Sequence, residues 1–177
     1  LRLHTRKSMS RRKPIGESPP SLLQKEHFLR ETLSELLQTI PPDRSPSWGR
    51  MGPQHMVEHL EDAFRMANGK DVYTGIFTPD ERLPKMQAFL RSDQDFKEMT
   101  KNILLPDEPL PLRLTDLRCA IAKLEKEIID FFAFWEGHRS KTLRNPFFGD
   151  LDFELWVALL YKHCQHHLRQ FAVLPRI

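Results

Sequence analysis

The sequence has few of the features that mark secreted or membrane-spanning proteins. It contains two cysteines in 177 residues, Cys119 and Cys164, and they fall on separate expected helices. Small secreted domains depend on closely spaced disulfides, so this scarcity favours a reducing environment. No apolar run approaches the roughly 18 residues of a membrane span, and residues 1–14 lack the apolar region of a secretory signal. We therefore predict a cytoplasmic protein with no membrane partner.

Several sequence patterns of common enzyme classes are also missing. The chain has no Ser-His-Asp order, no glycine-rich phosphate loop and no paired Cys-x-x-Cys. These absences argue against acyl-transfer, nucleotide-binding and zinc-ribbon chemistry. No segment shows sustained period-two alternation of apolar and polar residues, so we predict no sheet.

Charge and composition indicate one globular domain preceded by a basic tail. The hydrophobic fraction is 40% and the charged fraction 29%, which is typical of a soluble domain. Residues 1–17 carry six basic side chains and one acidic one, a net charge of +5, although the whole chain carries +3. We predict a flexible tail over 1–17 and a single domain over 18–177. Basic tails also bind nucleic acid or acidic surfaces, and this alternative stays open.

Apolar residues at helical spacing predict four long amphipathic helices. The first follows Ser18-Pro-Pro-Ser21 and ends at Pro41-Pro42, and the second runs from near Pro53 to Asn68. The third begins at Thr115-Asp116 and ends near Gly137, and it should be the most buried of the set. The fourth begins after Asp152, which we expect to be its N-cap, and continues to about Phe171.

Residues Lys70 to Leu114 interrupt this pattern with five prolines and one weak helical stretch, Lys85 to Arg91. Connections of this length in compact domains usually cover a site or wrap the fold. The alternative is a surface connection across two helices. The sequence thus predicts an all-α fold, a four-helix bundle with a long crossover between its second and third helices.

Three histidines fall on the inward faces of two of these helices. His163 and His167 lie one turn apart on the apolar face of the last helix, at the spacing with which a helix offers two nitrogens to one metal ion. His59 borders the apolar stripe of the second helix, whereas His55 points further towards solvent. A histidine on an apolar face is more often a core residue with hydrogen-bond partners. Burying three imidazoles together without a shared partner would be costly, which favours a metal site formed by His59, His163 and His167.

Neutral imidazole suits zinc, nickel, iron or copper, and three protein ligands leave one position open. We expect zinc or nickel first, with iron or another divalent ion as alternatives. By helix geometry, the polar residues nearest to the rings are Glu58, Asp62 and Gln170, which could orient them or could simply be surface residues. Cys164 is a candidate fourth ligand or reactive thiol, but its place on the flank of the stripe favours an inert buried cysteine.

Two regions of the sequence carry a resemblance to a known family. They are Trp48-Gly-Arg-Met51 with Gln54-His-Met-Val-Glu-His59, and Asn145-Pro-Phe-Phe-Gly149 leading to Lys162-His-Cys-Gln-His-His-Leu-Arg-Gln-Phe171. Over roughly residues 22–174 the chain resembles a bacterial branch of the DinB/YfiT-like superfamily. That branch commonly has histidine where this chain has Asn145.

The resemblance implies a four-helix bundle that binds a divalent metal through one histidine of the second helix and a His-x-x-x-His pair of the fourth. Carried over, these ligands are His59, His163 and His167. Better-studied relatives include transferases and isomerases in which the metal activates a low-molecular-weight thiol, although substrates change more readily than folds.

Three hypotheses on function follow. The first is a metal-dependent enzyme, a hydrolase or thiol S-transferase, in which the ion activates water or a small thiol for an unknown small-molecule substrate. The second is a helical bundle that binds a metal or ligand without catalysis, alone or as a homodimer. The third, and least favoured, is a protein that associates with nucleic acid through its basic tail.

Overall fold

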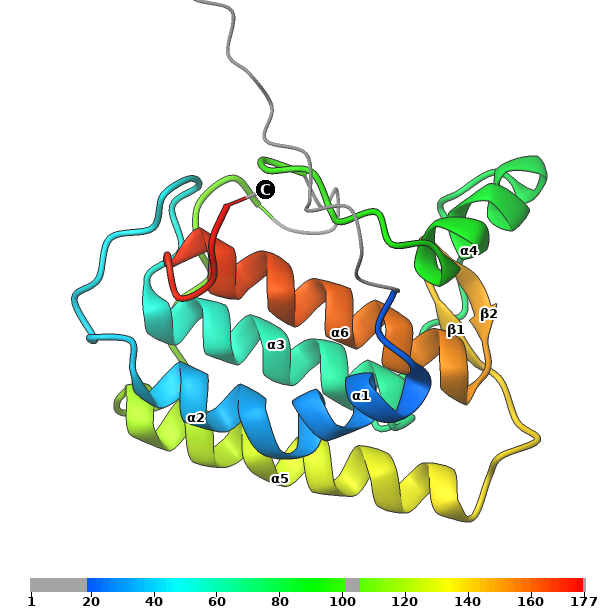
Figure 1. Ribbon diagram of the computed structural model, residues 1–177, viewed down its shortest axis with the longest axis horizontal. Helices are drawn as coiled ribbons and strands as arrows, with labels where there is room; N and C mark the ends of the chain where they lie inside the picture. Colours follow the sequence, from blue (N-terminus) through cyan, green and yellow to red (C-terminus); the bar gives the residue numbers. More distant parts are fainter. Residues whose placement is uncertain (1–18, 101–105, 177) are drawn as a thin grey trace, which may run out of the picture.

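The computed structural model describes residues 19–100 and 106–176, and this part of the chain is mostly helical (Figure 1). The basic tail expected over 1–17 lies outside the described residues. In chain order the elements are α1 (Leu22–His27), η1 (Phe28–Thr32), α2 (Leu33–Gln38), α3 (Pro53–Ala67), η2 (Asp80–Arg82), α4 (Leu83–Arg91), α5 (Leu117–Glu136), β1 (Leu143–Asn145), β2 (Gly149–Leu151) and α6 (Phe153–Gln170).

Polar caps mark the starts of α1, α5 and α6, whereas α3 has no side-chain cap and begins with Pro53 as its first residue. Ser21 caps α1 in a reciprocal capping box with Gln24, and the carboxylates of Asp116 and Asp152 accept hydrogen bonds from the backbone N–H groups of the first turns of α5 and α6. The predicted first helix is interrupted by η1, a π-helical segment of five residues, but its chain direction is maintained into α2. The predicted helix starts are therefore confirmed.

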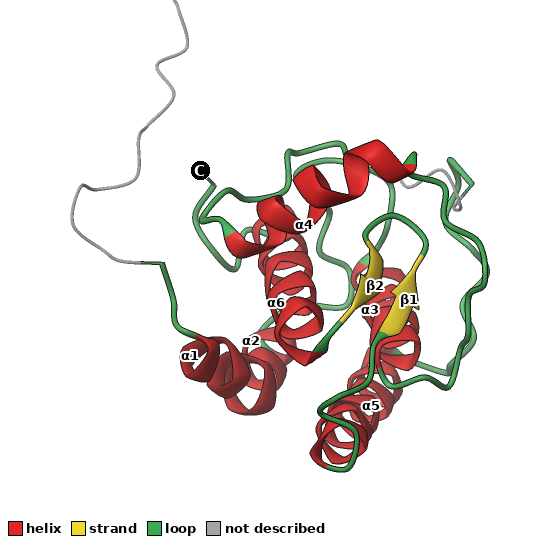
Figure 2. Ribbon diagram, turned by 90° about the vertical axis from the view of Figure 1, so that its right-hand side faces the viewer, coloured by secondary structure: helices red, strands yellow, loops and turns green. Residues whose placement is uncertain are grey.

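The helices pack around one continuous apolar core. Helix α3 contacts both α5 and α6, and the α1–α2 segment contacts α5 and α6 from the other side (Figures 1 and 2). The largest fully buried side chains include Trp135 and Phe131 of α5, Trp156 of α6 and Phe64 of α3, whereas α1 contributes none. The expectation that the third long helix is the most buried was wrong, because 12 of the 18 residues of α6 are buried against 9 of the 20 residues of α5. Helix α6 is covered by α1, α3 and α4, so it is enclosed on more sides.

A short hairpin corrects the prediction of no sheet. Strands β1 and β2 pair antiparallel, with Leu143 opposite Leu151 and Asn145 opposite Gly149. The Asn145 side-chain oxygen accepts from the N–H groups of Phe147 and Phe148, and Gly149 has a φ of +75° that favours glycine. Each strand has three residues, which is too few for an alternating pattern to stand out in the sequence.

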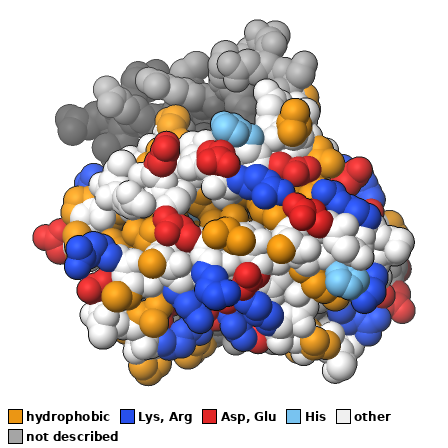
Figure 3. Space-filling view, turned by 90° about the horizontal axis from the view of Figure 1, so that it is seen from below, with side chains coloured by type: hydrophobic (Ala, Val, Ile, Leu, Met, Phe, Trp, Pro, Cys, Tyr) orange, Lys and Arg blue, Asp and Glu red, His pale blue; other side chains and the backbone are white. Residues whose placement is uncertain are grey.

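The crossover between α3 and α5 is partly structured, as expected, and contains η2 and α4. Helix α4 lies against α6 at the hairpin end of the molecule (Figure 2). Across residues 19–100 and 106–176, no helix combines the length and apolar character needed to cross a bilayer. The face seen in Figure 3 mixes acidic, basic and apolar side chains and presents no continuous basic stripe.

Candidate metal site

Helices α3 and α6 bring His59, His163 and His167 together. The Nε2 atom of His163 lies 2.9 Å from Nε2 of His59 and 3.0 Å from Nε2 of His167. In the described part of the chain these three residues form a group whose candidate ligand atoms all lie within 4.8 Å of one another. His167 is buried, at 6% exposure, whereas His59 and His163 are half-buried. The convergence that helical periodicity predicted is therefore confirmed.

Hydrogen bonds among the three rings cannot satisfy all three Nε2 atoms. A neutral imidazole has one N–H and one lone pair, on different nitrogens. The Nε2 atom of His163 faces two other nitrogens, so it can donate one proton to one of them or offer one lone pair, but cannot do both. One of the two contacts is left without a good hydrogen bond, and such a contact costs free energy when it is partly desolvated.

A shared cation would resolve this conflict, and the spacing suits one. Nitrogens bound to a tetrahedral zinc at about 2.0–2.1 Å lie about 3.3 Å apart. Two of the three separations, 2.9 and 3.0 Å, differ from this by a few tenths of an ångström, which side-chain rotation can supply, and the third pair, His59 and His167, lies within 4.8 Å. The donor set therefore fits a borderline divalent ion such as zinc or nickel.

Burial keeps the three imidazoles neutral. It lowers the pKa of His59 to about 4, with further lowering from the positive charges of His166 and Arg113. Burial also lowers the pKa of His163 and of His167 well below the ordinary value, and the neighbouring histidines act in the same direction. Neutral rings are the form that binds a metal ion, so no proton has to leave before binding at pH 7.

Gln170 is the polar residue that orients one of these rings. Its Oε1 lies 2.7 Å from Nδ1 of His167, and its Nε2 donates to the backbone carbonyl of Trp48 at 2.8 Å. The residue is 4% exposed, so both contacts are shielded from water. Of the three polar neighbours proposed from helix geometry, Gln170 is confirmed as a partner of the histidine cluster.

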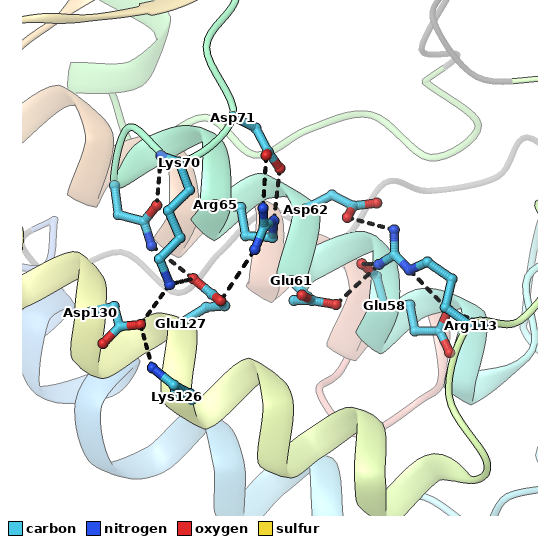
Figure 4. Close-up of polar contacts among 11 residues, drawn as sticks. Glu58, Glu61, Asp62, Arg65, Lys70, Asp71, Arg113, Lys126, Glu127 and Asp130 are labelled. Carbon is cyan, nitrogen blue, oxygen red and sulfur yellow. Dashed lines mark hydrogen bonds and ion pairs between the residues drawn. The ribbon is translucent and has the colours of Figure 1, made fainter.

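The other two proposed neighbours contact a different residue. Glu58 and Asp62 both bind Arg113, which lies at the end of the crossover (Figure 4). The Arg113 guanidinium also reaches Glu61 at 3.1 Å and the backbone carbonyl of Glu58 at 2.9 Å. The interpretation of Glu58 and Asp62 as ring-orienting residues was therefore wrong, because helix geometry gave no information on a cation more than 50 residues away in the sequence.

The crossover is fastened to α6 beside the cluster. The buried Lys162 ammonium, one residue before His163, donates to the backbone carbonyls of Ser92 at 2.7 Å and Gln94 at 2.5 Å. The His166 ring lies between the rings of Trp48 and Phe96, at centroid distances of 5.4 and 6.2 Å. Sequence reasoning missed these contacts, and a lysine within the otherwise apolar face of the last helix was the one signal that could have indicated them.

Cys164 lies apart from the candidate ligands. It is fully buried, and burial raises the pKa of its thiol far above the ordinary value, which disfavours the reactive thiolate. It is not part of the group of converging ligand atoms. The prediction of a buried, inert cysteine agrees with this environment.

Comparisons of the chain with protein-family models, with curated proteins and with solved structures found no match. The assignment of function consequently depends on the site itself.

Proposed function

We propose that this protein is a metal-binding four-helix bundle of the DinB/YfiT-like type, and that His59, His163 and His167 hold a divalent ion in a metal-dependent enzyme. The observation that carries the proposal is the meeting of three neutral Nε2 atoms whose mutual hydrogen bonds cannot all be formed. The resemblance of the His-x-x-x-His segment and of the Gln54 to His59 segment to that superfamily supports the same three ligands.

His59, His163 and His167 would hold the ion through three neutral imidazoles, and the ion would supply the means to lower the pKa of a bound water molecule or small thiol. The residues around the site differ in how much they are buried. His59 and His163 are half-buried, whereas His167 and Gln170 beside them are buried. This arrangement favours hydrolysis or thiol transfer on a small molecule.

The experiment that tests the proposal measures metal content and affinity in the purified full chain. We expect about one zinc or nickel per chain by elemental analysis, and we expect His59→Asn, His163→Asn and His167→Asn each to lower zinc affinity at least 100-fold. His55→Asn on α3 and His166→Asn on α6 are matched controls, because each removes an imidazole from the same helix outside the converging group. Equal affinity in the control and ligand variants would refute the site.

A screen of hydrolysis and thiol-transfer substrates separates catalysis from simple binding. Turnover that is lost in the ligand variants and kept in the His55→Asn control supports the enzyme. Stoichiometric metal with no turnover across both reaction classes would instead support the alternative of a non-catalytic metal-binding bundle.

A further inference from the structure

We propose that Gln170 is a positioning residue that sets the proton of His167 on Nδ1 and connects the candidate metal site to the loop of residues 47–50. The inference deepens the proposed function, since it concerns how the same site is prepared for a metal ion. Its first test is made on metal-free protein, so it does not depend on whether the ion binds.

The orientation of the Gln170 amide follows from its partner in the loop. The backbone carbonyl of Trp48 can only accept a hydrogen bond, so the group 2.8 Å from it must be the amide NH₂. The amide oxygen then faces Nδ1 of His167, 2.7 Å away, and can only accept. Nδ1 therefore carries the proton of the neutral imidazole.

This proton position has a direct consequence at the cluster. With its single proton on Nδ1, the His167 ring presents a lone pair at Nε2, the atom 3.0 Å from Nε2 of His163. The lone pair is what a metal ion needs, and no tautomeric change has to precede binding. Gln170 thus prepares the most deeply buried of the three candidate ligands.

The loop also bonds to the backbone of Gln170, and a glycine in the loop makes room for the Gln170 side chain. The Ser47 N–H donates to the Gln170 backbone carbonyl at 2.7 Å. Gly49 has a φ of +76°, and a Cβ at this position would lie 3.0 Å from the Gln170 Nε2 atom. Glycine at position 49 therefore allows both the backbone conformation and the close approach of the amide. A displacement of the loop and a displacement of the His167 ring are coupled through one side chain.

Long-range ¹H–¹⁵N correlation spectra of ¹⁵N-histidine-labelled, chelator-treated protein test the first part. We expect the His167 ring, identified by its loss in a His167→Gln variant, to show a protonated Nδ1 and an unprotonated Nε2. A ring with its proton on Nε2 in the wild-type chain would overturn the inference without bearing on metal binding.

Two substitutions at position 170 separate the contact with the ring from the contact with the loop. At a pH where it is ionised, Gln170→Glu can still accept from Nδ1 of His167 but cannot donate to the Trp48 carbonyl, whereas Gln170→Leu can do neither. We expect zinc affinity to fall about 10- to 100-fold in Gln170→Leu, the range typical of losing the orienting partner of a ligand, and to stay within about threefold of wild type in Gln170→Glu. Hydrogen exchange of the Ser47 amide should accelerate in both variants.

A substitution of Gly49 tests whether a change in the loop alters zinc binding. Gly49→Ala should weaken zinc binding and accelerate exchange at Ser47, because the added Cβ forces the amide away from its position. Gly75→Ala is the matched control, since no atom lies within 4 Å of a Cβ placed there. Wild-type zinc affinity in both Gln170→Leu and Gly49→Ala, in folded protein by circular dichroism, would overturn the positioning role.

Discussion

The buried carboxylate of Glu58 holds the end of the crossover against α3, and replacing it with glutamine tests this role. Its Oε1 accepts from the Gln54 amide at 3.0 Å and the Leu114 N–H at 3.2 Å, and its Oε2 accepts from the Arg113 N–H at 2.9 Å. Glu58 is 5% exposed. Both oxygens are therefore used as acceptors, one residue before the candidate ligand His59 in the sequence.

Glu58→Gln keeps the size of the side chain and replaces one of these oxygens with an NH₂ group, which cannot accept. Whichever way the amide turns, at least one N–H donor loses its partner, and a buried donor left unsatisfied costs about 1–3 kcal/mol. The charge that attracts the Arg113 guanidinium, 3.4 Å away, is lost as well. We expect a decrease of about 2 kcal/mol in the free energy of unfolding, or roughly 4–8 °C in the melting temperature of a chain of this size.

The stability difference between wild type and Glu58→Gln should depend on pH. Burial raises the pKa of Glu58, but the backbone N–H groups of Arg113 and Leu114, the Gln54 amide and the Arg113 charge lower it by more, so the net pKa lies below the ordinary 4.5. A carboxyl group with a lowered pKa stabilises the fold fully above the unfolded-state value and loses this effect as the pH falls through the folded-state value. Since glutamine does not titrate, the difference between wild type and Glu58→Gln should shrink as the pH falls below about 4.5.

Urea unfolding of both proteins between pH 7 and pH 3 measures the difference. Zinc affinity is the control and should change less than threefold, because Glu58 contacts the crossover and not the histidine cluster. Equal stability of the two proteins at pH 7, or a difference that stays constant down to pH 3, would refute the argument.

Three further predictions concern the helices that carry the candidate ligands. Asp152→Ala removes the acceptor for the Leu155 N–H at the start of α6 and should lower stability by about 1 kcal/mol, measured by urea unfolding; an unchanged midpoint would show that the cap contributes nothing. Zinc at 100 times its Kd should stabilise the metal-free chain by about 2.7 kcal/mol, a rise in melting temperature of roughly 5–11 °C by calorimetry; no rise would argue against a preformed site. His163→Leu should abolish this zinc effect and raise the stability of the metal-free protein by about 1 kcal/mol, since it removes the nitrogen that cannot satisfy both neighbours; a less stable metal-free variant would contradict the conflict described above.

Periodicity and capping residues were sufficient to predict the long helices. Leu29, Leu33 and Leu37 recur at a spacing of four and are all buried, and Ser21 and Asp152 mark helix starts through hydrogen bonds that involve neighbouring residues alone. The hairpin of β1 and β2 was missed for the opposite reason. Its strands are too short for a pattern, and it depends on the turn formed by Asn145 and the positive φ of Gly149.

The candidate ligands could be predicted because a helix fixes which side chains share a face. His163 and His167 lie four residues apart on α6, and both turned towards α3 as their spacing indicated. The partners of the acidic residues on α3 could not be predicted in this way. Arg113 binds Glu58 and Asp62 because the crossover returns to α3, and where a long connection returns is decided by tertiary packing.

If His59, His163 and His167 hold a metal ion as proposed, the same three side chains lower the stability of the metal-free protein. Apolar side chains at positions 59, 163 and 167 would continue the core between α3 and α6 without polar nitrogens, whereas an imidazole nitrogen that is buried without a hydrogen-bond partner costs free energy. Among residues 19–100 and 106–176, the hydrogen bonds of the three Nε2 atoms are those they make with one another. The surrounding structure does provide an acceptor, Gln170, for the one nitrogen whose protonation frees a lone pair towards the cluster. This arrangement supports the proposed metal site, because a cation is the partner that accepts lone pairs from several nitrogens at once.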